Sequence, residues 1–530
     1  MEQEKLFTEL RGSLRETVKR AEKNLVWLRK HMHPFFFITM QDEKRALVTL
    51  ASVLAVLRAG KRVVLDEEEN RISLASLSEP GSFFDALRTV GERGIFLAEL
   101  HHSLQAVPGV DRLLEVLRFE FSSDILPGSG RGLSPLPKEK ALLVKAFMKR
   151  RYPSYEPRHL EEDLALLIEN NRRYAEISPP ERIGRVLWLY RQGKVHEGLF
   201  LDTEEDVDSF FLRESRVLFS VRNPPERGFL AQAMEVFRRL GIGVHRAYCL
   251  AMTDGKGSSF LGTFYVKTGK GKLLERDSKS FRTLKTELYN TQILSTTSRP
   301  YREHVLAGTM TGQEASLTNA FIGFCYTTLA HRHPDRYHLS EVVAAFTVNP
   351  EQTLRLCRLF LARFDPKQEK GEKAWPASLD KAEAAIAGYN TGHRHLDGVR
   401  RTIYRTALLF IRHTLKTNFF VPEKHALAFR LDPHYLDDLG DSFTGDLPSG
   451  KPFRITFFSG RHGLGYHVGF ADIARGGWRT VICGDEDDYN ENAETLFREV
   501  YVLAHTQHLK NKDIYEGGSK MVTLLDNSDV

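Results

Sequence analysis

The last 115 residues restrict the fold most, because short alternating strands there give way to one long amphipathic helix. Alternating apolar and polar residues predict four strands, at 425–431, 453–458, 466–470 and 478–483. Apolar residues at helical spacing then predict a helix over 491–510. The pattern indicates a small mixed sheet covered by a helix that ends at Lys510.

Cations and paired glycines recur together in this region. The residues concerned are Arg475, Gly476, Gly477, Arg479, Lys510, Gly517, Gly518 and Lys520. A fixed cation suits a carboxylate, and glycine lets main-chain groups approach a ligand without an intervening side chain. Two interpretations follow: a cleft for a ligand with two carboxylates, or a solvated basic surface. The first expects Arg475, Lys510 and Lys520 to share one cleft.

A resemblance separates these interpretations. Residues 514–522, Ile-Tyr-Glu-Gly-Gly-Ser-Lys-Met-Val, resemble the active-site signature of the glutamate, leucine, phenylalanine and valine dehydrogenase superfamily. Segments 424–433, 452–479 and 496–525 resemble the large NAD-specific glutamate dehydrogenases, which carry long amino-terminal regulatory extensions. This sequence departs from the superfamily pattern at Tyr515, Met521 and Asn527, where Pro, Gly and Pro or Leu are expected.

The resemblance implies a role for each matching residue. Lys520 corresponds to the catalytic lysine, Lys510 to the cation that holds the substrate α-carboxylate, and Arg475 to the cation for the distal carboxylate. The neighbouring residues Gly476, Gly477, Arg479, Gly517 and Gly518 complete the expected substrate-binding set. The implied reaction is oxidative deamination of L-glutamate to 2-oxoglutarate and ammonia with NAD, by a homo-oligomer. A cation at Arg475 favours glutamate over apolar amino acids, which would leave that charge buried and unpaired.

A Rossmann domain is marked by a strand, a Gly-x-Gly-x-x-Gly turn, a helix and a later acidic residue. The sequence contains no such unit. We therefore expect no cofactor-binding residues in this chain, with NAD bound by a Rossmann-containing carboxy-terminal half. That half is expected either beyond a truncation or on a separate polypeptide. The alternative function is a non-catalytic regulatory or assembly protein with an amino-acid-sensing module.

The preceding sequence is predicted to be α+β and multidomain. Five segments are expected: an α+β domain at 1–130, a helical linker at 131–210, a βαββ module at 211–275, a helical domain at 276–415 and a partial substrate domain at 416–530. The βαββ order, with strands near 217–221, 242–251 and 259–266 and a helix at 228–240, resembles an ACT domain. Its turn at 225–230 suits an amino-acid effector, or the module only holds subunits together.

Several local patterns carry weaker expectations. Residues 1–31 predict an amphipathic helix, and 35–40 a short strand followed by a helix through Leu57. The strand, helix, strand order over 35–72 leaves a second ACT-like fold open. Gly- and Pro-rich residues 127–137 predict a linker, and 365–378 an exposed connection within a helical middle.

Charge and cysteine usage exclude some classes. The net charge of +6 arises from 75 basic and 69 acidic residues without a run of like charges, so nucleic acid is not implied. Four single cysteines and no membrane-length apolar stretch predict a soluble, cytoplasmic protein. The histidine groups at 331–338 and 393–395 read as loops, so no metal site is expected.

Overall fold

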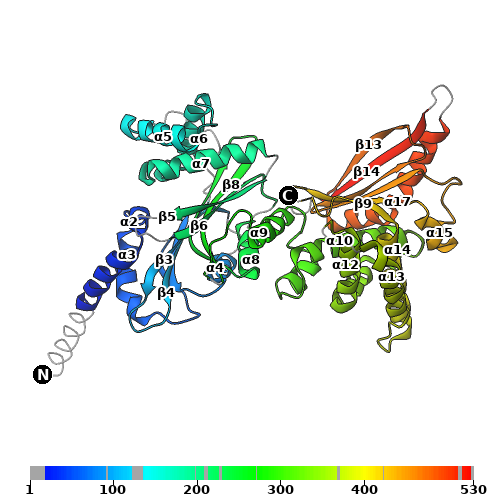
Figure 1. Cartoon of the computed structure of the whole chain (residues 1–530), viewed down its shortest axis with the longest axis horizontal. Coiled ribbons are helices and arrows are strands. Elements are labelled where there is room, and N and C mark those ends of the chain that lie inside the picture. The colour runs from blue at the N-terminus through cyan, green and yellow to red at the C-terminus, as the bar shows by residue number, and fades with distance from the viewer. Residues whose placement is uncertain are drawn as a thin grey trace. The chain divides into compact units, whose positions relative to one another are not determined.

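The computed structural model describes most of the chain and forms two compact units, Met1–Lys285 and Thr286–Val530 (Figure 1). The described residues are 18–90, 94–121, 135–196, 199–207, 213–225, 229–269, 271–366, 371–421, 423–510 and 516–526. We refer to the two bodies as unit 1 and unit 2. The five-segment division expected from the sequence stays a prediction.

An antiparallel sheet of eight strands organises unit 1, in the order β1-β2-β4-β3-β7-β8-β6-β5. Its strands are β1 (Val63–Glu68), β2 (Arg71–Leu77), β3 (Ile95–Ala106), β4 (Leu113–Phe121), β5 (Leu199–Val207), β6 (Arg213–Arg222), β7 (Ile242–Thr253) and β8 (Ser258–Thr268). The helices between the strand pairs are α4 (Ser82–Val90) and α8 (Phe229–Arg239). Two units of strand, strand, helix, strand, strand therefore follow one another and join where β3 pairs with β7.

The two faces of this sheet bear different helices. On one face, Phe83 of α4 stacks on Phe119 of β4, and Phe237 of α8 packs on Phe264 of β8. The other face carries the remaining helices: α2 (Pro34–Thr39), α3 (Lys44–Val53), the 3-10 turn η1 (Leu54–Val56), α5 (Lys138–Arg151), α6 (Arg158–Ile177) and α7 (Pro180–Val195). Alternation along each strand separates these faces, since neighbouring side chains point to opposite sides.

Unit 2 contains a six-stranded sheet in the order β13-β14-β12-β11-β10-β9. Its strands are β9 (Thr414–Thr417), β10 (Ala426–Leu431), β11 (Arg454–Gly460), β12 (Gly463–Gly469), β13 (Ala474–Cys483) and β14 (Gly517–Asp526). Its helices are α10 (Gly312–Leu329), α11 (Leu339–Val348), α12 (Pro350–Phe364), α13 (Gly371–Ala387), α14 (Arg394–His413), α15 (Tyr435–Leu439), α16 (Asp441–Thr444) and α17 (Glu486–Leu509), with short turns η2 (Pro300–Val305) and η3 (Ala330–Arg332). Helix α9 (Lys279–Asn290) runs across the boundary between the units.

The core of unit 2 is aromatic, and it fixes the helices against the sheet. Phe324 of α10, Phe410 of α14 and Phe457 of β11 are fully buried and contact one another, with ring centroids 4.7 to 6.0 Å apart. Helix α10 begins with a capping box, because Thr311 and Glu314 each bind the other's backbone N–H.

Many predicted elements are confirmed. The four carboxy-terminal strands correspond to β10, β11, β12 and β13, and the long helix to α17. The strand, helix, strand, strand order corresponds to β6, α8, β7 and β8, and its turn contains Gly255 at φ 76°. Residues 18–31 are helical as expected. The fold thus combines helices and sheets, as the sequence predicts. The sheet of unit 1 is antiparallel, and that of unit 2 is antiparallel except for the parallel pair β13 and β14.

Three local predictions are wrong. Residues 35–40 form helix α2 instead of a strand, because Pro34 stands at its first position and the His33 ring accepts the Phe35 N–H. The strand, helix, strand pattern over 35–72 therefore does not exist. Helix α13 occupies much of the expected connection at 365–378 and contains Pro376. Residues 517–526, which the sequence analysis did not assign to any element, form strand β14.

Some expectations lie outside the described residues. These are the helix over residues 1–17, most of the linker at 127–137 and the centre of the turn at 225–230. Within the described part of the chain, no helix is long and apolar enough to cross a membrane.

Candidate functional site

The three predicted cations all lie on one parallel strand, helix, strand crossover. Strand β13 runs parallel to β14, and helix α17 connects them. The helix begins at Asp485, whose carboxylate accepts the Asp488 N–H at 2.8 Å, and buries Leu496, Val500 and Ala504. Such a crossover brings the end of the helix back to the amino-terminal ends of both strands.

Strand register puts Arg475 and Lys520 on the same face of the sheet. Arg475 pairs with Gly518, and Gly477 pairs with Lys520. Paired residues of neighbouring strands point to the same side, and so do residues two apart. That side faces α17, because Arg479, two residues beyond Gly477, binds Glu499 of α17 at 2.8 Å. The structure therefore brings two of the three predicted cations together.

The third cation, Lys510, stands at the carboxy-terminal cap of α17. Two residues earlier in the helix, His508 accepts the Gly518 N–H at 3.3 Å through Nδ1. Lys510 is therefore close along the chain to the contact between α17 and β14. Residues 511–515, which connect Lys510 to Glu516, lie outside the described part.

Close packing requires glycine at three of these positions, which the sequence analysis did not predict. A Cβ on Gly518 would lie 2.0 Å from the His508 backbone nitrogen, and one on Gly517 would lie 2.2 Å from Ala471 Cβ. A Cβ on Gly476 would lie 1.7 Å from the Ser519 carbonyl oxygen. These glycines let β14 approach α17 and β13. Gly477 differs, because its Cβ would lie 3.3 Å from Lys520 Nζ, so its missing side chain leaves room beside that ammonium.

The cations also differ in their partners. Arg479 forms an exposed ion pair with Glu499 and is occupied. Arg475, Lys510 and Lys520 form no ion pair with any described residue. Arg475 is exposed on edge strand β13, and Lys520 is half-buried beside Gly477. Among the described residues, no carboxylate would therefore compete with a free anion for Arg475 and Lys520.

One aromatic contact near these cations had no role in the sequence interpretation. The His508 ring stacks on Phe470, with centroids 5.6 Å apart, and Phe470 N–H binds the Gly518 carbonyl. His508 thus fixes the start of β14 from the helix side. Its position in the last turn of an amphipathic helix was the available signal.

The crossover does not suit a dinucleotide. A bound pyrophosphate needs a helix amino terminus with free N–H groups and glycines around it. Helix α17 instead begins with Asp485, Glu486, Asp487 and Asp488, whose charges repel phosphate. The described residues therefore do not fit NAD at this turn.

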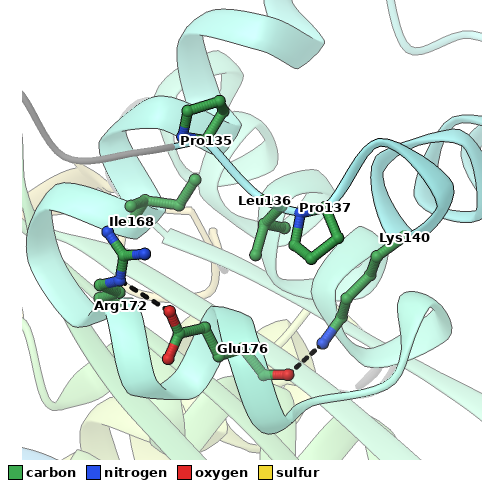
Figure 2. A pocket seen from close by; sticks show the side chains of 7 residues that line it. All are labelled: Pro135, Leu136, Pro137, Lys140, Ile168, Arg172 and Glu176. Carbon is green, nitrogen blue, oxygen red and sulfur yellow. Dashed lines mark hydrogen bonds and ion pairs between the residues drawn. The ribbon is translucent and has the colours of Figure 1, made fainter.

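One pocket in unit 1 is lined by charged residues that bind one another. It has a volume of about 330 Å³ and lies between the start of α5 and helix α6. Figure 2 shows Arg172 bound to the Glu176 carboxylate, at 2.7 Å, and Lys140 bound to the Glu176 carbonyl. The charges around this pocket therefore partner one another.

The histidine groups gather no metal ligands. His331 pairs with Asp446 at 2.6 Å, and His338 caps α11. No group of three His, Cys, Asp or Glu side chains suited to a metal ion occurs among the described residues.

Comparison with known proteins gives partial matches. The chain is 46% identical to glutamate dehydrogenase 2 of Dictyostelium discoideum over 123 residues, which are 23% of this chain and 11% of that protein. It is 44% identical over 124 residues to the NAD-specific glutamate dehydrogenase of Saccharomyces cerevisiae, and 47% identical over 119 residues to that of Neurospora crassa. These matches cover 23% and 22% of this chain and 11% of each relative.

No protein-family model matches the chain. The aligned residues span only about a tenth of the length of the curated relatives. Within that span, 44% to 47% of the residues are identical. The predicted resemblance to the large NAD-specific glutamate dehydrogenases is thereby confirmed for the matched part of this chain.

Proposed function

We propose that unit 2 supplies the substrate-binding part of an NAD-dependent glutamate dehydrogenase, which converts L-glutamate to 2-oxoglutarate and ammonia. The observation that carries this proposal is the β13–β14 register. It sets Arg475 and Lys520 on one face, with no described carboxylate paired to either. Two cations in fixed positions suit an amino acid with two carboxylates.

Each cation has a distinct role in the proposal. Arg475 binds the distal carboxylate, since a guanidinium offers two parallel N–H donors to one carboxylate. Lys510 binds the α-carboxylate from the end of α17. Lys520 accepts a proton from the water that adds to the imine carbon and returns a proton to the departing ammonia, and Gly477 leaves the Lys520 amine accessible.

The partners and location belong to the same proposal. A Rossmann-containing half completes the enzyme and binds NAD, and the active form is a homo-oligomer. Four buried, free cysteines, Cys249, Cys325, Cys357 and Cys483, support a reducing cytoplasm. The repeated strand, strand, helix, strand, strand units of unit 1 support an ACT-like regulatory role.

A second candidate is a regulatory or assembly protein without catalysis. The large antiparallel sheet of unit 1 favours it, because its two repeats contain none of the predicted cations Arg475, Lys510 and Lys520. In this reading the cations of unit 2 bind an amino acid without turning it over. The two candidates differ in a single measurable property, which is turnover.

Turnover of glutamate with NAD, measured after the chain is mixed with a Rossmann-containing half of a related enzyme, tests the proposal. Lys520→Ala should lower the turnover number by about a hundredfold or more, as expected for loss of a general acid or base. Lys416→Ala is the matched control, because this exposed lysine stands on β9 at the opposite edge of the same sheet. Equal turnover in wild type and Lys520→Ala would refute the assigned role.

A further inference from the structure

A cavity of about 250 Å³ lies in unit 1 between the start of α7 and the sheet face that bears α2 and α7. Arginines and tyrosines dominate its wall. Arg246, Tyr265 and Arg216 form one row across β7, β8 and β6, since Arg246 pairs with Tyr265 and Tyr265 with Arg216. Arg182 and Arg185 reach the same space from the first turns of α7.

Three of these arginines have carboxylate partners. Arg182 binds Glu99 at 2.7 Å, Arg216 binds Glu204 at 2.6 Å, and Arg246 binds Glu214 at 2.7 Å. Buried charges are normally paired in this way, because an isolated ion in a protein interior is costly.

Arg185 is the exception. Arg185 is 9% exposed, yet it forms no ion pair or hydrogen bond with a described residue, and its Nε is buried without a partner. It interacts with the Glu204 carboxylate, which is bound to Arg216, only electrostatically. The arginine at the Figure 2 pocket, Arg172, has Glu176 instead. A guanidinium remains charged at every physiological pH, so Arg185 cannot escape this cost by losing its proton. A bound anion would remove the cost.

Further unused donors surround Arg185. Arg182 has two buried nitrogens, Nε and Nη1, without partners, although its Nη2 is bound to Glu99. The Tyr248 hydroxyl is also buried without a partner. Burial raises the pKa of Tyr248, so its hydroxyl stays protonated and can donate. These donors need acceptors, and the cavity wall offers few.

Aromatic rings hold two of the arginines in place, and a helix terminus adds positive potential. The Tyr248 ring lies against the Arg182 guanidinium, 3.7 Å from ring centroid to Cζ, and Tyr265 lies 4.1 Å from that of Arg246. The amino terminus of α7 also reaches the cavity, and its cap residue Pro179 provides no side-chain acceptor. The helix dipole there adds positive potential, and Glu181, an exposed residue that also lines the cavity, offsets part of it.

We infer that this cavity binds a small oxyanion ligand, a compact molecule with a carboxylate or phosphate group. Its oxygens accept hydrogen bonds from Arg185, Arg182 and Tyr248. The volume is below the range of about 300 to 1,000 Å³ typical for drug-sized ligands, so a dinucleotide is excluded. The site does not depend on Arg475, Lys510 or Lys520, and it gives unit 1 a ligand of its own.

Thermal unfolding and isothermal titration of the full chain test this inference. Inorganic phosphate, succinate and sodium chloride are compared at matched ionic strength. Phosphate or succinate should raise the melting temperature above the chloride value, and the stronger of the two identifies the preferred oxyanion. Arg185→Met should weaken its binding roughly tenfold to a hundredfold, as expected for loss of a charge-assisted hydrogen bond.

The controls separate binding from folding. Arg172→Met, in the same unit but paired with Glu176, should leave the binding constant unchanged. Without added anion, Arg185→Met should unfold no earlier than wild type, because it removes a buried unpaired charge. Tyr248→Phe keeps the ring packing and should weaken binding several-fold. The proposed site would be refuted if all three salts raised the melting temperature equally, or if the anion-dependent rise persisted in Arg185→Met.

Discussion

Units 1 and 2 both concentrate cations, but they do so in opposite ways. In unit 1 the arginines are buried on an antiparallel sheet, and they come from segments between residues 182 and 246. In unit 2 the cations lie between residues 475 and 520, on an exposed edge strand and the crossover that follows it. A site formed by one crossover leaves a trace in the sequence, whereas a site assembled across a sheet does not.

The difference in burial also determines how much each charged residue contributes to the free energy of unfolding. Glu99 is 2% exposed and forms ion pairs with Arg118 and Arg182. Burial alone would raise the Glu99 pKa, but the two arginines outweigh it and hold the pKa below its usual value. The exposed pair of Arg479 and Glu499 in unit 2 competes with water and salt. Unit 1 should thus be sensitive to charge removal, and unit 2 tolerant of it.

The largest expected effect is that of Glu99→Gln. Two buried guanidinium groups lose their shared carboxylate, so the free energy of unfolding should fall by about 3 to 5 kcal/mol. Because the folded pKa of Glu99 is depressed, its contribution exists above the ordinary carboxyl value of 4.5 and is lost as the pH falls through the folded pKa. Urea denaturation at several pH values measures both effects. A loss below 1 kcal/mol at neutral pH would show that burial does not distinguish the two units.

The second largest effect is expected for Gly518→Ala. This change should lower the free energy of unfolding by about 3 kcal/mol, the upper end of the usual overpacking cost. The new methyl group would meet the backbone of Gln507 and His508 at 2.0 to 2.4 Å, so α17 and β14 must separate. Hydrogen exchange of peptides from α17 and β14 locates the damage. Gly484→Ala is the control, because its Cβ would meet nothing within 4 Å. Normal protection in Gly518→Ala would mean that the glycine serves a ligand instead of packing.

An acid-dependent effect should come next. Burial lowers the pKa of His101 from 6.5 to about 3, so the folded state keeps this ring neutral while the unfolded chain takes up a proton. Stability from His101 is therefore present above pH 6.5 and falls with decreasing pH by about 1.4 kcal/mol per unit. His101→Gln should flatten this slope in urea denaturation between pH 6.5 and 4.5. An unchanged slope would contradict the buried neutral ring.

The smallest effect is expected for Glu499→Gln, which removes the exposed partner of Arg479. Such pairs contribute about 0 to 1 kcal/mol, and salt screens them. Urea denaturation at low and high salt should show a small difference that disappears at high salt. A loss as large as that of Glu99→Gln would erase the contrast between the units.

The sequence was most informative about unit 2. Alternation predicted β10 to β13 and helical spacing predicted α17, because each of these elements buries one face. The resemblance singled out Arg475 and Lys520, and the strand register then placed them on one face. The reason for Gly518 escaped prediction, because His508 becomes its neighbour only after α17 folds back onto β14.

Unit 1 shows where local reasoning fails. The strand predicted at 35–40 is a helix because Pro34 and the His33 cap override the apolar run. In unit 2, residues 365–378 were predicted to form an exposed connection, but helix α13 begins at Gly371 and runs through Pro376. Arg185 lies in a charged helix without any distinguishing pattern. Only tertiary structure shows that it is buried and forms no ion pair or hydrogen bond with a described residue.

Titration of L-glutamate into the full chain and its Arg475→Met variant tests the central proposal most directly. The dissociation constant should rise roughly tenfold to a hundredfold in Arg475→Met, because the distal carboxylate loses its guanidinium. It should stay unchanged in Lys416→Met, and L-glutamine should bind wild type and Arg475→Met alike. Equal glutamate affinity in wild type and Arg475→Met would contradict a dicarboxylate site on β13 and β14.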